Sequence, residues 1–119
     1  MIIDDRMQNL AKLMDVSMLR AQVHSTNLAH QNTPGFVARK VEFDQAFRDA
    51  VARGDNQGAR SVAPKVVEDR SGMFDNDGNN VSGAAEVAVL AQNRVLYEAY
   101  ASAMRGKGRI LDMAIRGGG

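Results

Sequence analysis

The sequence predicts a mainly α-helical protein, in which long N-terminal and C-terminal helices pack as a coiled-coil-like hairpin with a short extended and looped segment between them. Two observations predict this fold class. Apolar residues recur every three or four positions near both ends of the chain, which is the spacing of one helix face. The middle contains both prolines and many other turn-forming residues. We therefore divide the chain into a first helix (1–32), a middle segment (33–80), a second helix (81–116) and a tail (117–119).

The composition narrows the class of protein further. The 119 residues suit one domain, with 7 methionines, no tryptophan and only 5% aromatic residues. Such a chain favours thin helix-on-helix contacts, to which the adaptable methionine side chain is suited. A net charge of +1 does not mark it as a binder of nucleic acid or membrane surfaces. The absence of cysteine excludes disulfides and thiol chemistry.

Two kinds of targeting segment are not indicated by the sequence. No apolar run approaches the roughly 18 residues that a membrane span needs. The first ten residues, MIIDDRMQNL, lack the continuous apolar stretch of a cleaved secretory signal. We expect no direct membrane span and no cleaved signal peptide.

The first segment has apolar residues on more than one helix face. The main stripe consists of Ile3, Met7, Leu10, Met14, Met18, Ala21 and Leu28. A second, thinner stripe carries Leu13, Val16 and Val23. A surface helix of a monomer needs only one such face. One interpretation is a helical hairpin buried in a small domain, and the other is that the additional face packs against neighbouring subunits.

The stretch NTPGF ends this helix. Pro34 lacks an N–H group and restricts Thr33, so we expect the helix to end near Asn32. Pro34 and Gly35 are favoured at the centre of a type II turn, in which the glycine takes a positive φ. Residues 36–43 then read as extended, because apolar residues alternate along them.

The remainder of the middle segment shows weaker patterns. Apolar residues at helical spacing predict a short helix over 43–51, closed by Gly54. Residues 55–80 are rich in Gly, Asp, Asn and Ser and are predicted to form a loop. Within that loop, PKVVED is compatible with one short strand.

The last segment has a heptad-like stripe sustained over about four repeats. Its large apolar members, which we call the seam, are Val87, Leu90, Tyr97, Met104, Leu111 and Ile115. A row of small residues lies beside the seam and consists of Ala84, Ala88, Ala91, Val95 and Ala99. Ser82 is the expected N-cap, since its hydroxyl can accept from the first turn.

We find no arrangement of residues that predicts catalysis, a cofactor or a metal ion. His24 and His30 are six residues apart and cannot share a helix face. The stretch DNDGNN lacks the acid order of a calcium loop, and RGKGR lacks the frame of a phosphate-binding loop. Arg105, Lys107 and Arg109 can contact phosphate, but cations near a helix C-terminus are also favoured by the helix dipole. The protein is not expected to be an enzyme.

Two segments of the chain resemble the signatures of bacterial flagellar basal-body rod proteins. The first is NLAHQNTPGF followed by Phe43, in which His30 and Val37 depart from the usual residues. The second runs from DGNNV through LAQNRVLY to LDMAI, with Ser82 where Asp is common. Together they cover residues 7–47 and 75–115. Among these proteins, the proximal rod members are the most similar. The alternatives are a sister rod protein and, less favoured, a basic helical hairpin that binds nucleic acid.

The resemblance implies a structural subunit that transmits torque in the flagellar rod. Such proteins pass through the flagellar type III export apparatus without a cleaved signal and polymerise helically through their terminal helices in the periplasm. The implied partners are further copies, other rod proteins, the adaptor and MS ring at the rod base, and the export apparatus, with no nucleic acid.

The resemblance and the residues together indicate an assembly motif. Its members are Asn27, Asn32, Thr33, Pro34, Gly35, Phe36 and Phe43. We expect Asn27 and Asn32 to bond backbone groups that are freed where the first helix ends. Phe36 is expected to enter a packing pocket, and the seam of the last helix is expected to drive assembly.

Overall fold

The computed structural model describes residues 4–117, and describes side chains as far as residue 109. In chain order the elements are α1 (Asp5–Ala29), β1 (Arg39–Glu42), α2 (Asp44–Ala52), α3 (Asn56–Ser61), β2 (Lys65–Glu68) and α4 (Gly83–Gly117). The molecule is an elongated body of 68 × 26 × 16 Å. The expected fold class is confirmed, since two long terminal helices dominate the structure.

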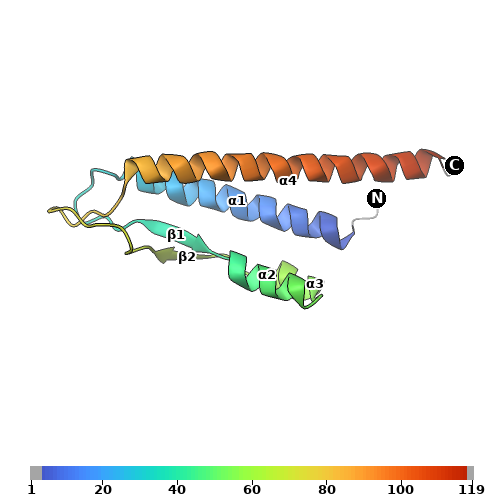
Figure 1. The fold of residues 1–119 in the computed structure, drawn as a ribbon, viewed down its shortest axis with the longest axis horizontal. Coiled ribbons are helices and arrows are strands. Elements are labelled where there is room, and N and C mark those ends of the chain that lie inside the picture. Colours follow the sequence, from blue (N-terminus) through green and yellow to red (C-terminus); the bar gives the residue numbers. More distant parts are fainter. Residues whose placement is uncertain (1–3, 118–119) are drawn as a thin grey trace.

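The two long helices lie side by side and run in opposite directions (Figure 1). α4 has 35 residues and α1 has 25, so α4 continues past the start of α1. Below α1 lies an arm formed by β1, α2, α3 and β2. The helix pair and the arm meet at the left end of Figure 1, where the turns and loops gather.

The arm is a β-hairpin with two short helices at its tip. β1 and β2 pair antiparallel, with Arg39 opposite Glu68 and Glu42 opposite Lys65. β2 falls in the predicted PKVVED segment, and α2 falls close to the predicted short helix. α3 was not predicted, because six residues give too little periodicity to be recognised. Its start is stabilised by Asp55, whose side chain accepts from the Gly58 N–H at 2.9 Å.

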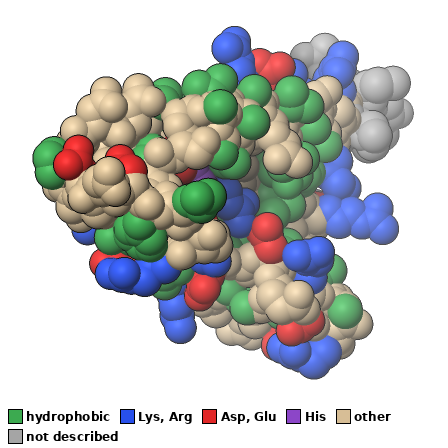
Figure 2. Space-filling model, turned by 60° about the vertical axis from the view of Figure 1, so that its left-hand side comes forward, with side chains coloured by type: hydrophobic (Ala, Val, Ile, Leu, Met, Phe, Trp, Pro, Cys, Tyr) green, Lys and Arg blue, Asp and Glu red, His purple; other side chains and the backbone are tan. Residues whose placement is uncertain are grey.

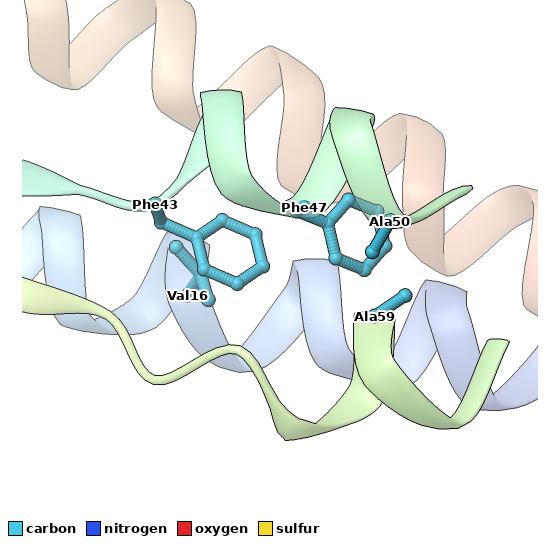
Figure 3. Packing of buried hydrophobic residues seen from close by; sticks show 5 residues of the cluster. All are labelled: Val16, Phe43, Phe47, Ala50 and Ala59. Atoms are coloured by element: carbon cyan, nitrogen blue, oxygen red, sulfur yellow. The ribbon is translucent and has the colours of Figure 1, made fainter. Parts of the chain in front are cut away.

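The hydrophobic core lies between α1 and the tip of the arm. Val16 of α1 packs with Phe43, Phe47, Ala50 and Ala59, as Figure 3 shows. The rings of Phe43 and Phe47 stack with centroids 5.0 Å apart. Burial of each such large apolar side chain contributes roughly 1.5–3 kcal/mol. The thinner apolar stripe of the first helix therefore faces the core, and it holds the arm.

The helix ends follow from local chemistry. α1 ends at Ala29 rather than Asn32, and the chain continues in turns from His30. The His30 N–H donates to the Thr26 carbonyl at 3.1 Å and to the Asn27 carbonyl at 3.0 Å. At the start of α4 the Ser82 hydroxyl accepts from the Ala85 N–H at 3.2 Å, which confirms the predicted cap.

Candidate assembly site

The NTPGF segment forms the predicted turn. Gly35 has a φ of 75°, and the Phe36 N–H donates to the Thr33 carbonyl at 3.2 Å. Both features are those of a type II turn. The turn does not stand alone, because the Gly35 N–H donates to the Asp77 carbonyl at 2.7 Å. The two signature segments, more than forty positions apart along the chain, therefore meet here.

The DNDGNN loop binds the turn through one side chain. The Asn79 amide donates to the carbonyl of His30 at 2.9 Å and to that of Thr33 at 2.8 Å. The loop is itself held by Asp75, whose carboxylate accepts from the Asp77 N–H at 2.9 Å and the Asn79 N–H at 3.0 Å. Asn79 therefore bonds two carbonyls of the turn that follows α1, in addition to the Thr33 and Phe36 N–H groups that these carbonyls accept from.

The next residue, Asn80, joins the open ends of the two strands. Its side-chain oxygen accepts from the Ala38 N–H at 2.7 Å, and its amide donates to the Asp69 carbonyl at 2.7 Å. Asn80 is buried, and a single amide side chain thus replaces one step of the β-ladder. The arm and the start of α4 are held together at this residue.

Asn27 has a different role from the one expected. Its side chain is buried and bonds both backbone groups of Arg39, accepting from the N–H at 2.9 Å and donating to the carbonyl at 2.7 Å. It binds the start of β1 rather than the end of its own helix. Asn32 is exposed. The expectation that both asparagines bond the freed helix end is therefore wrong, since carbonyls at the end of α1 accept from the His30 and Gln31 N–H groups instead.

A polar network connects α1, β1 and α4 beside Asn27. The Asn27 amide donates to a Glu86 carboxylate oxygen at 3.1 Å. The other Glu86 oxygen lies 2.6 Å from Nδ1 of His24. Glu86 is 8% exposed, so its charge is bound by two partners from α1 within a nearly closed environment. This network fixes the axial position of α4 against α1.

A second polar contact between the long helices lies further along them. The Asn93 amide donates to the Ser17 carbonyl at 2.8 Å, and both residues are buried. A side chain on α4 thus reaches the backbone of α1 at the helix contact. Glu86 and Asn93 are seven residues apart, so polar side chains occupy repeating positions of the stripe that faces α1.

The seam is divided between two environments. Leu90, Tyr97 and Met104 are half-buried, whereas Val87 is 54% exposed. The stripe facing α1 is rotated from the seam toward Glu86 and Asn93, which leaves one edge of the seam open. The seam positions Leu111 and Ile115 belong to α4, but their side chains lie outside the described residues.

The remaining members of the assembly motif have separate surroundings. Phe43 is buried in the core, and Phe36 is half-buried with its ring stacked on His30 at a centroid distance of 4.6 Å. Thr33 and Pro34 are exposed. Pro34 therefore acts through its backbone, and Thr33 offers its carbonyl to Asn79.

The sequence reasoning did not assign roles to His24, Asn79, Asn80 or Glu86. Each bonds a partner that is at least ten residues away, and such a partner cannot be read from local spacing. One signal was present in the sequence, since Glu86 is the single charge in the run from Gly83 to Gln92. A lone acid on an apolar helix turn indicates a specific polar partner.

The basic residues near the end of α4 are partly neutralised. The Lys107 ammonium lies 3.3 Å from Asp4, the N-cap of α1. The pKa of Asp4 lies below its ordinary value because the Met7 N–H donates to its carboxylate and Lys107 adds a bond and a positive charge. No group of three metal-ligating side chains gathers in the part of the chain that the structure describes. Within the same residues no helix has the length and hydropathy of a bilayer span.

The two terminal helices are closed at one end by a Pro-Gly turn and an asparagine-rich turn that bind each other, and the comparisons with known proteins give this arrangement a family. The chain belongs to the family of the flagellar basal body rod protein FlgB. It is 30% identical to FlgB of Borreliella burgdorferi over 72% of this chain and 77% of that protein. It is also 27% identical to FlgB of Bacillus subtilis over 93% of both chains.

A third relative agrees with this assignment. FlgB of Aeromonas hydrophila is 29% identical over 87% of both chains. No protein-family model matches the chain. Membership of this family makes the chain a structural protein of the flagellar basal-body rod and not an enzyme.

Proposed function

We propose that this chain polymerises helically into the proximal part of the flagellar rod and transmits torque through it. The observation that carries the proposal is the surface of the helix pair. Large apolar side chains remain exposed on both long helices, including Met18 at 60%, Val87 at 54% and Val95 at 67%. A monomeric protein gains nothing from these positions, whereas contacts between neighbouring subunits would bury them.

The segments have distinct roles in this proposal. Residues 1–32 and 81–116 supply the polymerising helices, and residues 33–80 supply the turn and arm that set their angle. Torque passes between subunits only if each subunit is stiff. The buried bonds of Asn27, Asn79 and Glu86 support such stiffness, because they join α1, the arm and α4 at one end of the molecule.

The proposal includes a location and partners. The chain crosses the inner membrane through the flagellar type III export apparatus without a cleaved signal and assembles in the periplasm. It contacts further copies, other rod proteins, and the adaptor and MS ring at the rod base. The similarity to rod proteins named FlgB supports this environment.

The test begins with deletion of the gene from its host. We expect the deletion strain to lack rod, hook and filament in electron micrographs of isolated basal bodies, and the unchanged gene to restore them. A Leu90→Asp variant would place a charge in the seam and add a desolvation penalty to assembly. We expect this strain to secrete the subunit and to build no rod.

A matched control uses an exposed position away from the seam. Arg53 lies at the end of α2 and is exposed, so Arg53→Asp should leave flagellation unchanged. Flagellated cells after deletion of the gene would contradict the proposed function. If the Leu90→Asp and Arg53→Asp strains are equally flagellated, then the seam does not drive assembly.

A further inference from the structure

A pocket of about 500 Å³ opens on the arm, beside the point where β1 leads into α2. We call it the arm pocket. The apolar part of its walls comes from both sides of the arm and consists of Val41, Phe43, Ala46, Val62 and Ala63. Such walls favour an apolar occupant, because filling the pocket removes their surface from water.

The arm pocket also reaches the first turn of α2, which starts without a side-chain cap. Residues 44–46 open this helix and line the pocket. Their N–H groups precede the first bond of the helix, in which the Phe47 N–H donates to the Phe43 carbonyl at 3.1 Å. Asp44 is the acid of this turn, and Arg20 of α1 binds it at 2.6 Å. An uncapped helix start favours a further negatively charged group nearby.

The charges around the arm pocket have a small positive excess. Arg48 and Lys65 line the pocket, and neither takes part in an ion pair within the part of the chain that the structure describes. Glu42 also lines the pocket and lies opposite Lys65 in the strand register. Together with the pair of Arg20 and Asp44, three cations stand against two acids. The pocket therefore suits an apolar group with acidic neighbours.

The loop between β2 and α4 presents a group of this kind. Met73 is 94% exposed and Phe74 is 42% exposed, and we call these two residues the apolar tip. The guanidinium of Arg70 lies 5.7 Å from the centroid of the Phe74 ring, which leaves Met73 uncovered. Residues 69–77 carry three aspartates against one arginine. Figure 2, in which this end of the molecule comes forward, shows hydrophobic and acidic side chains close together on its surface.

The apolar tip cannot enter the arm pocket of its own copy. The loop lies among the turns at one end of the molecule, and the two strands separate it from the start of α2 (Figure 1). The loop is also bonded in place. The Asn80 amide donates to the Asp69 carbonyl at 2.7 Å, and the Asp75 N–H donates to the Asn79 carbonyl at 2.8 Å. A second copy is therefore needed to bring a tip to a pocket.

We propose that the apolar tip of one copy enters the arm pocket of the next. The inference rests on the proposed function and specifies one of its subunit contacts, which is made by the middle segment and not by the terminal helices. The Met73 side chain fills the apolar walls, and aspartates of the same loop face the α2 start and the rim cations. Because tip and pocket are different surfaces, the contact is heterologous and adds subunits in one direction, as a helical assembly requires.

Cross-linking between single cysteines tests this contact, since the chain has no cysteine of its own. Cells would co-express two full-length forms, Met73→Cys and Ala63→Cys, and isolated basal bodies would be treated with a short bismaleimide. We expect a linked dimer from the mixture and its loss when either form is expressed alone. Arg53→Cys in place of Ala63→Cys is the matched control, because Arg53 is exposed on the same arm but does not line the pocket.

Three results of this experiment would overturn the proposal. The first is the absence of the mixed dimer in basal bodies from flagellated cells. The second is a dimer from Met73→Cys alone, because it requires tips that meet each other. The third is a link from Ala63→Cys to a different protein without the mixed dimer, because another occupant would then fill the pocket.

A charge placed on the apolar tip gives a second, independent test. We expect Met73→Glu to reduce the number of flagellated cells severalfold, and Met73→Leu to preserve it. The thermal midpoint of the purified Met73→Glu subunit should not change, since the side chain is exposed in a single copy. Asn76→Glu is the matched control, because it adds the same charge at an exposed position of the same loop.

This contact and the proposed function can fail separately. If deletion of the gene abolishes the rod, but Met73→Glu cells are flagellated like Asn76→Glu cells, then the contact is wrong while the proposed function stands. Flagellated deletion cells would instead contradict the proposed function itself.

Discussion

The Asn27 side chain bonds Arg39 as a neighbouring strand would, with one donor and one acceptor. Asn80 does the same between Ala38 and Asp69, and Asn79 bonds two carbonyls of the turn. Amide side chains therefore replace backbone partners where regular structure ends. These residues join segments that the thin hydrophobic core does not reach.

Replacing Asn27 with alanine tests this role. The change leaves the backbone groups of Arg39 without their buried partner and removes one donor from Glu86. Loss of each buried partner costs about 1–3 kcal/mol, so we expect a clearly lower thermal midpoint by circular dichroism. Asn32→Ala is the matched control, because that residue belongs to the same motif and is exposed. Equal midpoints for the two variants would contradict the assigned role.

The sequence was sufficient to predict the structure at residues whose backbone conformation depends on local chemistry. Pro34 and Gly35 restrict their own backbone, and the predicted turn is present. The role of Asn27 could not be predicted, because its partners Arg39 and Glu86 lie 12 and 59 positions away. The residue itself appeared in the predicted motif, but only the fold shows what it bonds.

The length of a helix decided whether the sequence could predict it. α1 and α4 have enough turns for a periodic pattern to stand out, and both were predicted. α3 has six residues, and its only buried side chain is Ala59. The seam on α4 was predicted as one stripe, yet the face toward α1 is rotated away from it. Glu86 and Asn93 lie on the face toward α1, and a search for apolar residues passes over them.

The N-terminus of α1 should respond to acid. The pKa of the Asp4 carboxyl is lowered because it accepts from the Met7 N–H and binds Lys107. A carboxyl whose pKa is lower in the folded state stabilises that state above its unfolded pKa, and this contribution is lost as the pH falls through the folded pKa. We therefore expect fraying of the first turn below about pH 4. Cα chemical shifts of residues 5–8 would report it.

Asp4→Asn provides the control for this titration. Asparagine also accepts at the N-cap, but it does not titrate in this range. Its first turn should keep constant Cα shifts between neutral and acidic pH. If both proteins fray alike on acidification, the effect does not come from the N-cap carboxyl.

Across the whole molecule, the stabilising contacts are unevenly distributed. The core cluster and the buried polar side chains fall between Val16 and Asn93, and of the described hydrophobic residues only Met7 is buried outside this stretch. Further along α4, the described contacts with α1 include the half-buried Met104 and the ion pair of Lys107 with Asp4. The sequence contains one sign of this division, because Gly106 and Gly108 disfavour a helix in that part of the chain. It did not show that the arm covers just one section of α1.

The dilute monomer should therefore show a gradient of amide exchange along α4. We expect slow exchange near Glu86 and Asn93, whose side chains bind α1, and faster exchange beyond Met104. Gly106 and Gly108 each disfavour the helix by roughly 1 kcal/mol, and few contacts in one copy offset that cost. In assembled rods the gradient should disappear, because neighbouring helices would cover the exposed faces. Uniformly strong protection along α4 in the monomer would contradict this expectation, because it would show that the whole helix is stable in one copy without neighbours.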